Sequence, residues 1–215
     1  MKTGVLFDLD GTLLDTLEDL KDAVNAALGQ FGYPPRTREE VRRFVGNGAA
    51  RLMEKAVPEG VDYLPALTAF QTYYQANCRR KTAPYAGVAD ALAALKRKYP
   101  VAIVSNKPDG AVKALCAGYF PGVFALGEQE GCPRKPAPDM IFKAMAAIGA
   151  DRCVYVGDSE VDIATARNAG VPCVSVLWGF RDRDVLEQAG GQYFCGDSAA
   201  LVRTVETMLD GKMKI

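Results

Sequence analysis

The chain has 215 residues, of which 49% are hydrophobic and 24% are charged, with 26 basic and 26 acidic residues. This composition is typical of a globular protein. No apolar run approaches the ~20 residues that a membrane span needs, and no block of like charge suggests a nucleic-acid surface. We therefore expect neither a membrane nor a nucleic acid as a partner.

Histidine is absent from the sequence, and the six cysteines form no C-x-x-C pair. The lack of histidine excludes Ser-His-Asp and Cys-His catalysis and leaves acid–base chemistry to carboxylates, lysines or tyrosines. Scattered cysteines in a chain of this size predict reduced, mostly buried thiols rather than a zinc site. We therefore expect a cytoplasmic protein.

The first predicted element is a strand, "GVLFDLD" at 4–10, and the following segment is helical. Helical patterns cover 17–32, 37–46, 49–57 and 64–81, and no convincing strand interrupts them. Pro34, Pro35 and Pro58 separate these patterns. The segment 16–83 is therefore predicted to be a small helical bundle inserted after the first strand.

Strands and helices alternate in the rest of the chain. Apolar runs at 101–106, 123–127, 153–158 and 173–177 predict strands, several of them buried on both faces. Helices are predicted at 87–99, 138–149 and 160–170, the last two ending at the capping residues Gly149 and Gly170. The pattern predicts an α/β fold with a Rossmann-like parallel sheet core, residues 1–15 and 84–215, and a helical cap, residues 16–83.

Polar residues close three of the predicted strands, and a basic residue precedes a helix. They are Asp8, Asp10 and Thr12 after the first strand, Ser105 and Asn106 after the second, Asp158 with Asp162 after the fourth, and Lys135. Because ligands bind beyond the carboxyl ends of parallel strands, we expect one shared rim. Carboxylates without cysteine or histidine favour Mg²⁺, which would offset the repulsion between them and bind substrate phosphate.

Four motifs occur in the order "DLDGTLLDT", "SNK", "KPAPD" and "GDSEVD". Together they closely resemble the motifs of the haloacid dehalogenase-like superfamily, and the resemblance includes the helical insert, which is similar to the family's cap. The resemblance implies that Asp8 attacks phosphorus and that Asp10 acts as general acid and then general base. Because dehalogenases of the superfamily lack a carboxylate at the position of Asp10, phosphoryl transfer is expected.

The resemblance also implies a ligand set. Asp8, the main-chain carbonyl of Asp10 and Asp158 would hold Mg²⁺, with Asp162 in support. The phosphoryl oxygens would be bound by Thr12, Ser105, Asn106 and Lys135. Lys107, the last residue of the second motif, follows the predicted strand and either reaches the site or faces solvent.

The turn Gly46-Asn47-Gly48 resembles the corresponding cap segment of bacterial phosphoglycolate phosphatases. Free amides at the start of a helix bind anions, so the turn is expected to hold the carboxylate of 2-phosphoglycolate. Arg51 is the expected helper, with Arg42 and Arg43 as alternatives. The same turn is also ordinary loop chemistry. "TYYQ" at 72–75 and Trp178 are interpreted as packing residues.

The leading hypothesis is a Mg²⁺-dependent phosphatase acting on a small phosphorylated metabolite, as a monomer or homodimer, through an aspartyl-phosphate. One alternative is a phosphomutase similar to β-phosphoglucomutase, although the relatives considered use a cap histidine that this chain lacks. Others are a phosphatase for a sugar phosphate and a non-catalytic phosphate-binding module. Cap movement is expected to hinge at 14–16 and 82–86.

Overall fold

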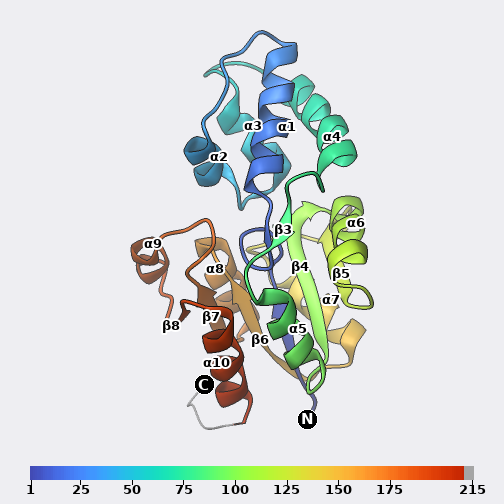
Figure 1. Cartoon of the computed structure of the whole chain (residues 1–215), viewed down its shortest axis with the longest axis vertical. Helices are drawn as coiled ribbons and strands as arrows, with labels where there is room; N and C mark the ends of the chain where they lie inside the picture. The colour runs from blue at the N-terminus through green and yellow to red at the C-terminus, as the bar shows by residue number, and fades with distance from the viewer. Residues whose placement is uncertain (211–215) are drawn as a thin grey trace.

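A six-stranded parallel sheet forms the centre of the computed structural model, which describes residues 1–210 (Figure 1). The strand order is β5-β4-β1-β6-β7-β8. The strands are β1 (Thr3–Phe7), β4 (Val101–Pro108), β5 (Phe124–Glu128), β6 (Arg152–Gly157), β7 (Cys173–Val176) and β8 (Tyr193–Cys195). Because β1 lies between β4 and β6, the ends of these three strands are neighbours in space.

Helices cover both faces of the sheet, as expected from its continuous apolar strands. Val5 and Phe7 point to one face, where they join the apolar side chains of α5 (Val88–Lys96), α6 (Asp109–Tyr119) and α10 (Ser198–Leu209). Leu6 points to the other face, against α7 (Asp139–Ile148) and α8 (Glu160–Ala169). This alternation follows from the two-residue period of a strand. Gly149 and Gly170 end α7 and α8 in left-handed conformation, so both predicted caps are confirmed.

Four helices stand beyond the carboxyl ends of the strands: α1 (Leu17–Gln30), α2 (Arg38–Phe44), α3 (Gly48–Ala56) and α4 (Leu64–Asn77) (Figure 1). Helix α1 packs along α4, and both bury apolar side chains in the shared core. Thr37 and Glu40 form a reciprocal capping box at the start of α2. The assignment of residues 16–83 as a separate cap domain stays a prediction.

A short antiparallel ribbon joins the four helices to the sheet. It consists of β2 (Leu14–Asp15) and β3 (Ala83–Pro84), with Leu14 opposite Pro84. The sequence analysis did not predict this ribbon, nor β8, α6, α9 (Arg183–Gln188) and α10. Strands of two or three residues are too short for an apolar pattern to reveal them.

Two further findings bear on the expectations from composition. Over residues 1–210, no helix combines the length and the apolar character that a membrane crossing requires. All six cysteines are free thiols, as predicted, and five of them are buried.

Candidate active site

The carboxyl edge of the sheet holds a cavity of about 560 Å³. Asp8 directly follows β1, Asp158 directly follows β6, and Ser105 lies in the second half of β4. The predicted residues that line this cavity are Asp8, Asp10, Gly46, Gly48, Ser105, Asn106, Lys135 and Asp158. The fold therefore brings together residues that are far apart in the sequence, as expected for a parallel sheet.

Lys135 lies at the centre of a buried polar cluster. Its ammonium Nζ lies 2.8 Å from Asp8 Oδ1 and 2.7 Å from Asp162 Oδ1, and the side chain is 3% exposed. It also donates to the hydroxyl of Tyr155 at 3.0 Å, and that hydroxyl in turn donates to Asp162. Burial alone would lower the pKa of Lys135, but the two carboxylates raise it above its usual value. Lys135 is therefore a fixed positive charge beside Asp8.

Asp158 is held by its own set of donors. The hydroxyl of Thr12 donates to Oδ1 at 3.1 Å, and the main-chain N–H of Phe180 donates to Oδ2 at 2.7 Å. A Cβ atom at Gly11 or at Gly179 would collide with this carboxylate, so both positions need glycine. Thr12 is fully buried and holds Asp158, whereas the sequence analysis predicted a phosphate contact for it.

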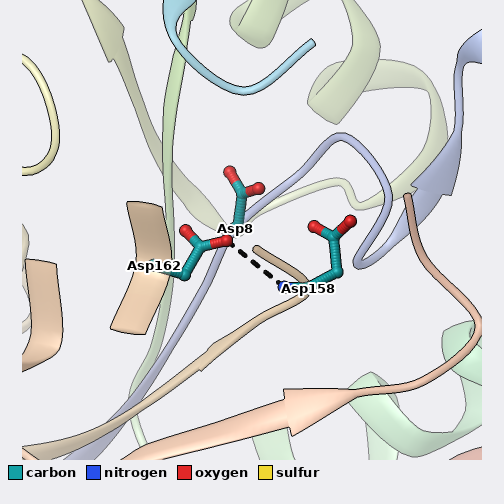
Figure 2. A group of neighbouring side chains, drawn as sticks. All are labelled: Asp8, Asp158 and Asp162. Carbon is teal, nitrogen blue, oxygen red and sulfur yellow. Dashed lines mark hydrogen bonds between the residues drawn. The ribbon is translucent and has the colours of Figure 1, made fainter. Parts of the chain in front are cut away.

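Three carboxylates gather at this edge of the sheet (Figure 2). Burial, together with the charges of Asp162 and Asp158, raises the pKa of Asp8 well above its usual value, against the opposing effect of Lys135. Burial and the charge of Asp162 raise the pKa of Asp158 to about 7. Burial also opposes ionisation of Asp162, but Lys135 and the hydrogen bonds from Ser159 and Tyr155 lower its pKa. One lysine therefore faces three buried carboxyl groups, and ionisation of Asp8 and Asp158 stays unfavourable without a further positive charge.

This arrangement fits a hard cation. Each of Asp8, Asp158 and Asp162 offers an oxygen, and these oxygens lie within 4.8 Å of one another. Both oxygens of Asp162 already accept hydrogen bonds, Oδ1 from Lys135 and Oδ2 from Ser159. An all-oxygen donor set suits Mg²⁺, and the saturation of Asp162 fits the supporting role predicted for it.

A second buried ion pair lies at the other side of the cavity. Lys107 Nζ is 2.9 Å from Asp10 Oδ1, and the hydroxyl of Thr16 donates to the same oxygen at 2.6 Å. Nζ also lies 4.5 Å from the ring centroid of Tyr74, on α4. Burial would lower the pKa of Lys107, but the charge of Asp10 raises it above its usual value.

Lys107 is therefore a buried residue of the site, which decides between the two alternatives left open by the sequence. Tyr74, interpreted from the sequence as packing, also lines the cavity. Nothing in the sequence pattern distinguishes Tyr74 from Tyr73, because only the rotation of α4 decides which ring faces the cavity.

The remaining predicted residues differ in position. The side-chain amide of Asn106 donates to the carbonyls of Lys135 and Gly46, and its oxygen accepts from the Lys135 N–H, so it braces the site. Asn47 does not line the cavity. Arg51 is 57% exposed and pairs with Glu54 on the outer surface of α3. Arg181, which the sequence analysis did not single out, lines the cavity instead.

Known proteins resemble this chain over most of its length. A family model described as haloacid dehalogenase-like hydrolase matches residues 5–176, which run from the middle of β1 to the end of β7 and include the inserted helices. The chain therefore belongs to the haloacid dehalogenase-like hydrolase family, and it is an enzyme of the hydrolase class. The resemblance inferred from the four sequence motifs is confirmed.

Several relatives of this chain are named phosphoglycolate phosphatases. Phosphoglycolate phosphatase 1 of Pseudomonas aeruginosa is 34% identical over 200 residues, covering 86% of this chain and 73% of the relative. The phosphoglycolate phosphatase of Caulobacter vibrioides is 36% identical over 195 residues, covering 84% and 81%. A crystal structure from Lactobacillus delbrueckii subsp. bulgaricus, described as a candidate phosphoglycolate phosphatase, has a TM-score of 0.89 and 36% identity, covering 95% of this chain and 99% of its own. The expected α/β fold is thereby confirmed.

Proposed function

We propose that the chain is a Mg²⁺-dependent phosphatase that hydrolyses a small phosphate monoester, 2-phosphoglycolate, through an aspartyl-phosphate. The observation that carries the proposal is the position of Asp8 and Asp10 in one cavity, each paired with a buried lysine. The names of the curated relatives support the choice of substrate.

Asp8 is the proposed nucleophile. An oxygen of its carboxylate attacks phosphorus, the bond between phosphorus and the substrate alcohol breaks, and Asp10 in its acid form donates a proton to the leaving oxygen. Asp10 then takes a proton from the water that cleaves the aspartyl-phosphate. Lys107 holds the Asp10 carboxylate in place through its 2.9 Å contact.

The proposed phosphate-binding groups are Lys135 and Ser105. Lys135 supplies a buried positive charge, and the Ser105 Oγ accepts from the Lys107 N–H, which leaves its own proton for a phosphoryl oxygen. A Mg²⁺ ion held by Asp8, Asp158 and the carbonyl of Asp10 would neutralise charge on the phosphoryl group. Thr12 and Asp162 orient this carboxylate set.

The proposed carboxylate-binding group is the turn from Gly46 to Gly48. Gly46 and Gly48 have φ angles of 124° and 80°, and both line the cavity. Helix α3 begins at Gly48, and within the described residues the side chain of its N-cap residue, Asn47, makes no capping hydrogen bond. The first amides of a helix lack internal partners, so a substrate carboxylate can accept hydrogen bonds from them. We propose that residues 16–83 act as the cap that places this turn over the site.

The test measures phosphate release from 2-phosphoglycolate and from ethyl phosphate, which carries a methyl group where the carboxylate stands. Because a hydrogen bond to a charged group contributes ~1.5–3 kcal/mol, kcat/KM should favour 2-phosphoglycolate by about 10- to 100-fold. Chelation of Mg²⁺ should abolish both activities. Equal rates for the two esters would refute the assigned substrate.

Variants test the nucleophile. Asp8→Asn should abolish turnover and leave the fold intact, whereas Asp90→Asn, an exposed position on α5, should leave activity unchanged. Near-normal hydrolysis by Asp8→Asn would overturn the mechanism. Conversion of glucose 1-phosphate to glucose 6-phosphate, rather than release of phosphate, would identify a phosphomutase.

A further inference from the structure

Arg181 lies in the loop between β7 and α9 and reaches from the sheet unit to the inserted helices. Its guanidinium makes four hydrogen bonds. Two of them go to Glu160 in the first turn of α8, from Nε to Oε2 at 2.7 Å and from Nη2 to Oε1 at 3.2 Å. This two-point pairing orients the guanidinium plane.

The other two hydrogen bonds go to main-chain carbonyls at the end of α2. Nη1 donates to the carbonyl of Arg42 at 3.0 Å, and Nη2 donates to the carbonyl of Val45 at 2.7 Å. The last carbonyls of a helix lack internal partners and carry partial negative charge, so a guanidinium stabilises them. Gly46 follows directly, and its own carbonyl accepts from Asn106 on β4. Side chains of the sheet unit therefore hold the chain just before the Gly46–Gly48 turn.

Burial distinguishes Arg181 from its neighbour in the same region. The Arg181 side chain is 11% exposed. Arg42 pairs with Asp182 at 2.7 Å, but Asp182 is 70% exposed. Exposed ion pairs contribute little to stability, whereas a charged donor shielded from water binds carbonyls more strongly. Arg181 is therefore the main polar link between the two units at this point.

The same loop also contacts the carboxylate set. The N–H of Phe180, the residue before Arg181, donates to Asp158, and Gly179 allows the close approach. One short loop thus holds a proposed metal ligand at Phe180 and the end of α2 at Arg181. The loop that contacts Asp158 is therefore the same loop that binds the chain just before the Gly46–Gly48 turn.

We propose that Arg181 is a positioning residue: fixed by Glu160, it holds the end of α2 so that the Gly46–Gly48 turn stays over the cavity that contains Asp8. The inference rests on the proposed function in one respect, because it assigns the turn to the substrate carboxylate. Arg181 is then the residue that fixes the position of the Gly46–Gly48 turn relative to Asp8.

The experiment uses the full chain and the variants Arg181→Gln, Arg181→Lys and Glu160→Gln. Arg183→Gln is the matched control, because Arg183 is 60% exposed and its contacts are Glu187 on α9 and the ring of Phe194 on β8, both away from α2. Hydrogen exchange of residues 42–50 is measured first, since it requires no substrate. Loss of charge-assisted hydrogen bonds should speed exchange there by about tenfold or more in Arg181→Gln. Arg181→Lys and Glu160→Gln should give smaller increases, and Arg183→Gln none.

The second measurement is the ratio of kcat/KM for 2-phosphoglycolate to that for ethyl phosphate. Arg181→Gln should lower this ratio by about tenfold, mainly through KM for 2-phosphoglycolate. Unchanged exchange in residues 42–50 would overturn the proposal whatever the substrate, and so would an equal loss for both esters. If the wild-type chain shows no preference between the esters, the assigned substrate fails, and hydrogen exchange alone decides the role of Arg181.

Discussion

Replacement of Lys135 by methionine tests the charge balance of the site. The substitution keeps the length of the aliphatic chain but removes the donor that lies 2.8 Å from Asp8, 2.7 Å from Asp162 and 3.0 Å from the Tyr155 hydroxyl. Both carboxylates then stay buried without a positive partner. Removal of one partner of a buried ion pair typically costs ~3–5 kcal/mol.

The loss of unfolding free energy in Lys135→Met is measurable by urea denaturation. With a urea m-value of ~2–3 kcal/mol/M, a loss of ~3–5 kcal/mol lowers the unfolding midpoint by roughly 1–2 M. Lys143→Met, at an exposed position on α7, is the control and should change the midpoint little. Turnover should fall by about 10²–10³ in the Lys135 variant, because a charged group at the transferring phosphoryl is lost.

The pH dependence gives an independent check on the same variant. Without Lys135, the folded-state pKa of Asp8 and of Asp162 rises. A carboxyl group whose pKa is raised by folding lowers the stability of the folded protein as pH rises above the unfolded pKa of about 4. The stability gap between the variant and the wild type should therefore widen from pH 5 to pH 8. A gap below about 1 kcal/mol at pH 8, or one of equal size at both pH values, would refute the reasoning about buried charge.

Three further predictions concern neighbouring parts of the site. Because burial raises the pKa of Asp158 to about 7, the metal-free wild type should lose stability between pH 4 and pH 7, and Mg²⁺ should reduce that loss. Thermal unfolding with and without the ion measures this, and a metal-free midpoint that rises between pH 4 and pH 7 would contradict it. Lys107→Met should lower kcat by about 10²-fold or more by releasing Asp10, measured at saturating substrate against a circular-dichroism control for folding; an unchanged kcat would argue against the pairing. Gly11→Ala should raise the Mg²⁺ concentration needed for half-maximal activity at least tenfold, because φ is 84° there and a Cβ would displace Asp158. Titration of activity with Mg²⁺ measures this, and an unchanged half-maximal concentration would contradict it.

Much of the candidate site could be predicted because its chemistry is local in sequence. Asp8 and Asp10 follow a continuous apolar strand, and Asp158 follows another, so the rule for parallel sheets brings them to one edge. Lys135 was found through its motif, and the structure shows why a lysine is needed there, since it lies between two buried carboxylates.

Other roles depend on side-chain direction, which periodicity does not specify. Thr12 follows Asp10 by two residues and was expected to face phosphate, but its hydroxyl points to Asp158. Arg51 stands between Ala50 and Leu52, and Arg181 follows Phe180, so neither local sequence reveals the role of its arginine. The first nevertheless lies on an outer helix surface and the second beneath the inserted helices. Their difference comes from the packing of α2 and α3 over the sheet.

The sequence by itself determined the family, the strand–helix alternation, the position of the inserted helices and the two carboxylates proposed for catalysis. Each of these depends on neighbours within a few residues or on the fixed geometry of parallel strands. The tertiary structure alone decided that Lys107 pairs with Asp10, that Tyr74 faces the cavity and that Arg181 holds the end of α2. These contacts join segments between 30 and 140 residues apart, and their energies depend on burial, which emerges only when the chain has packed.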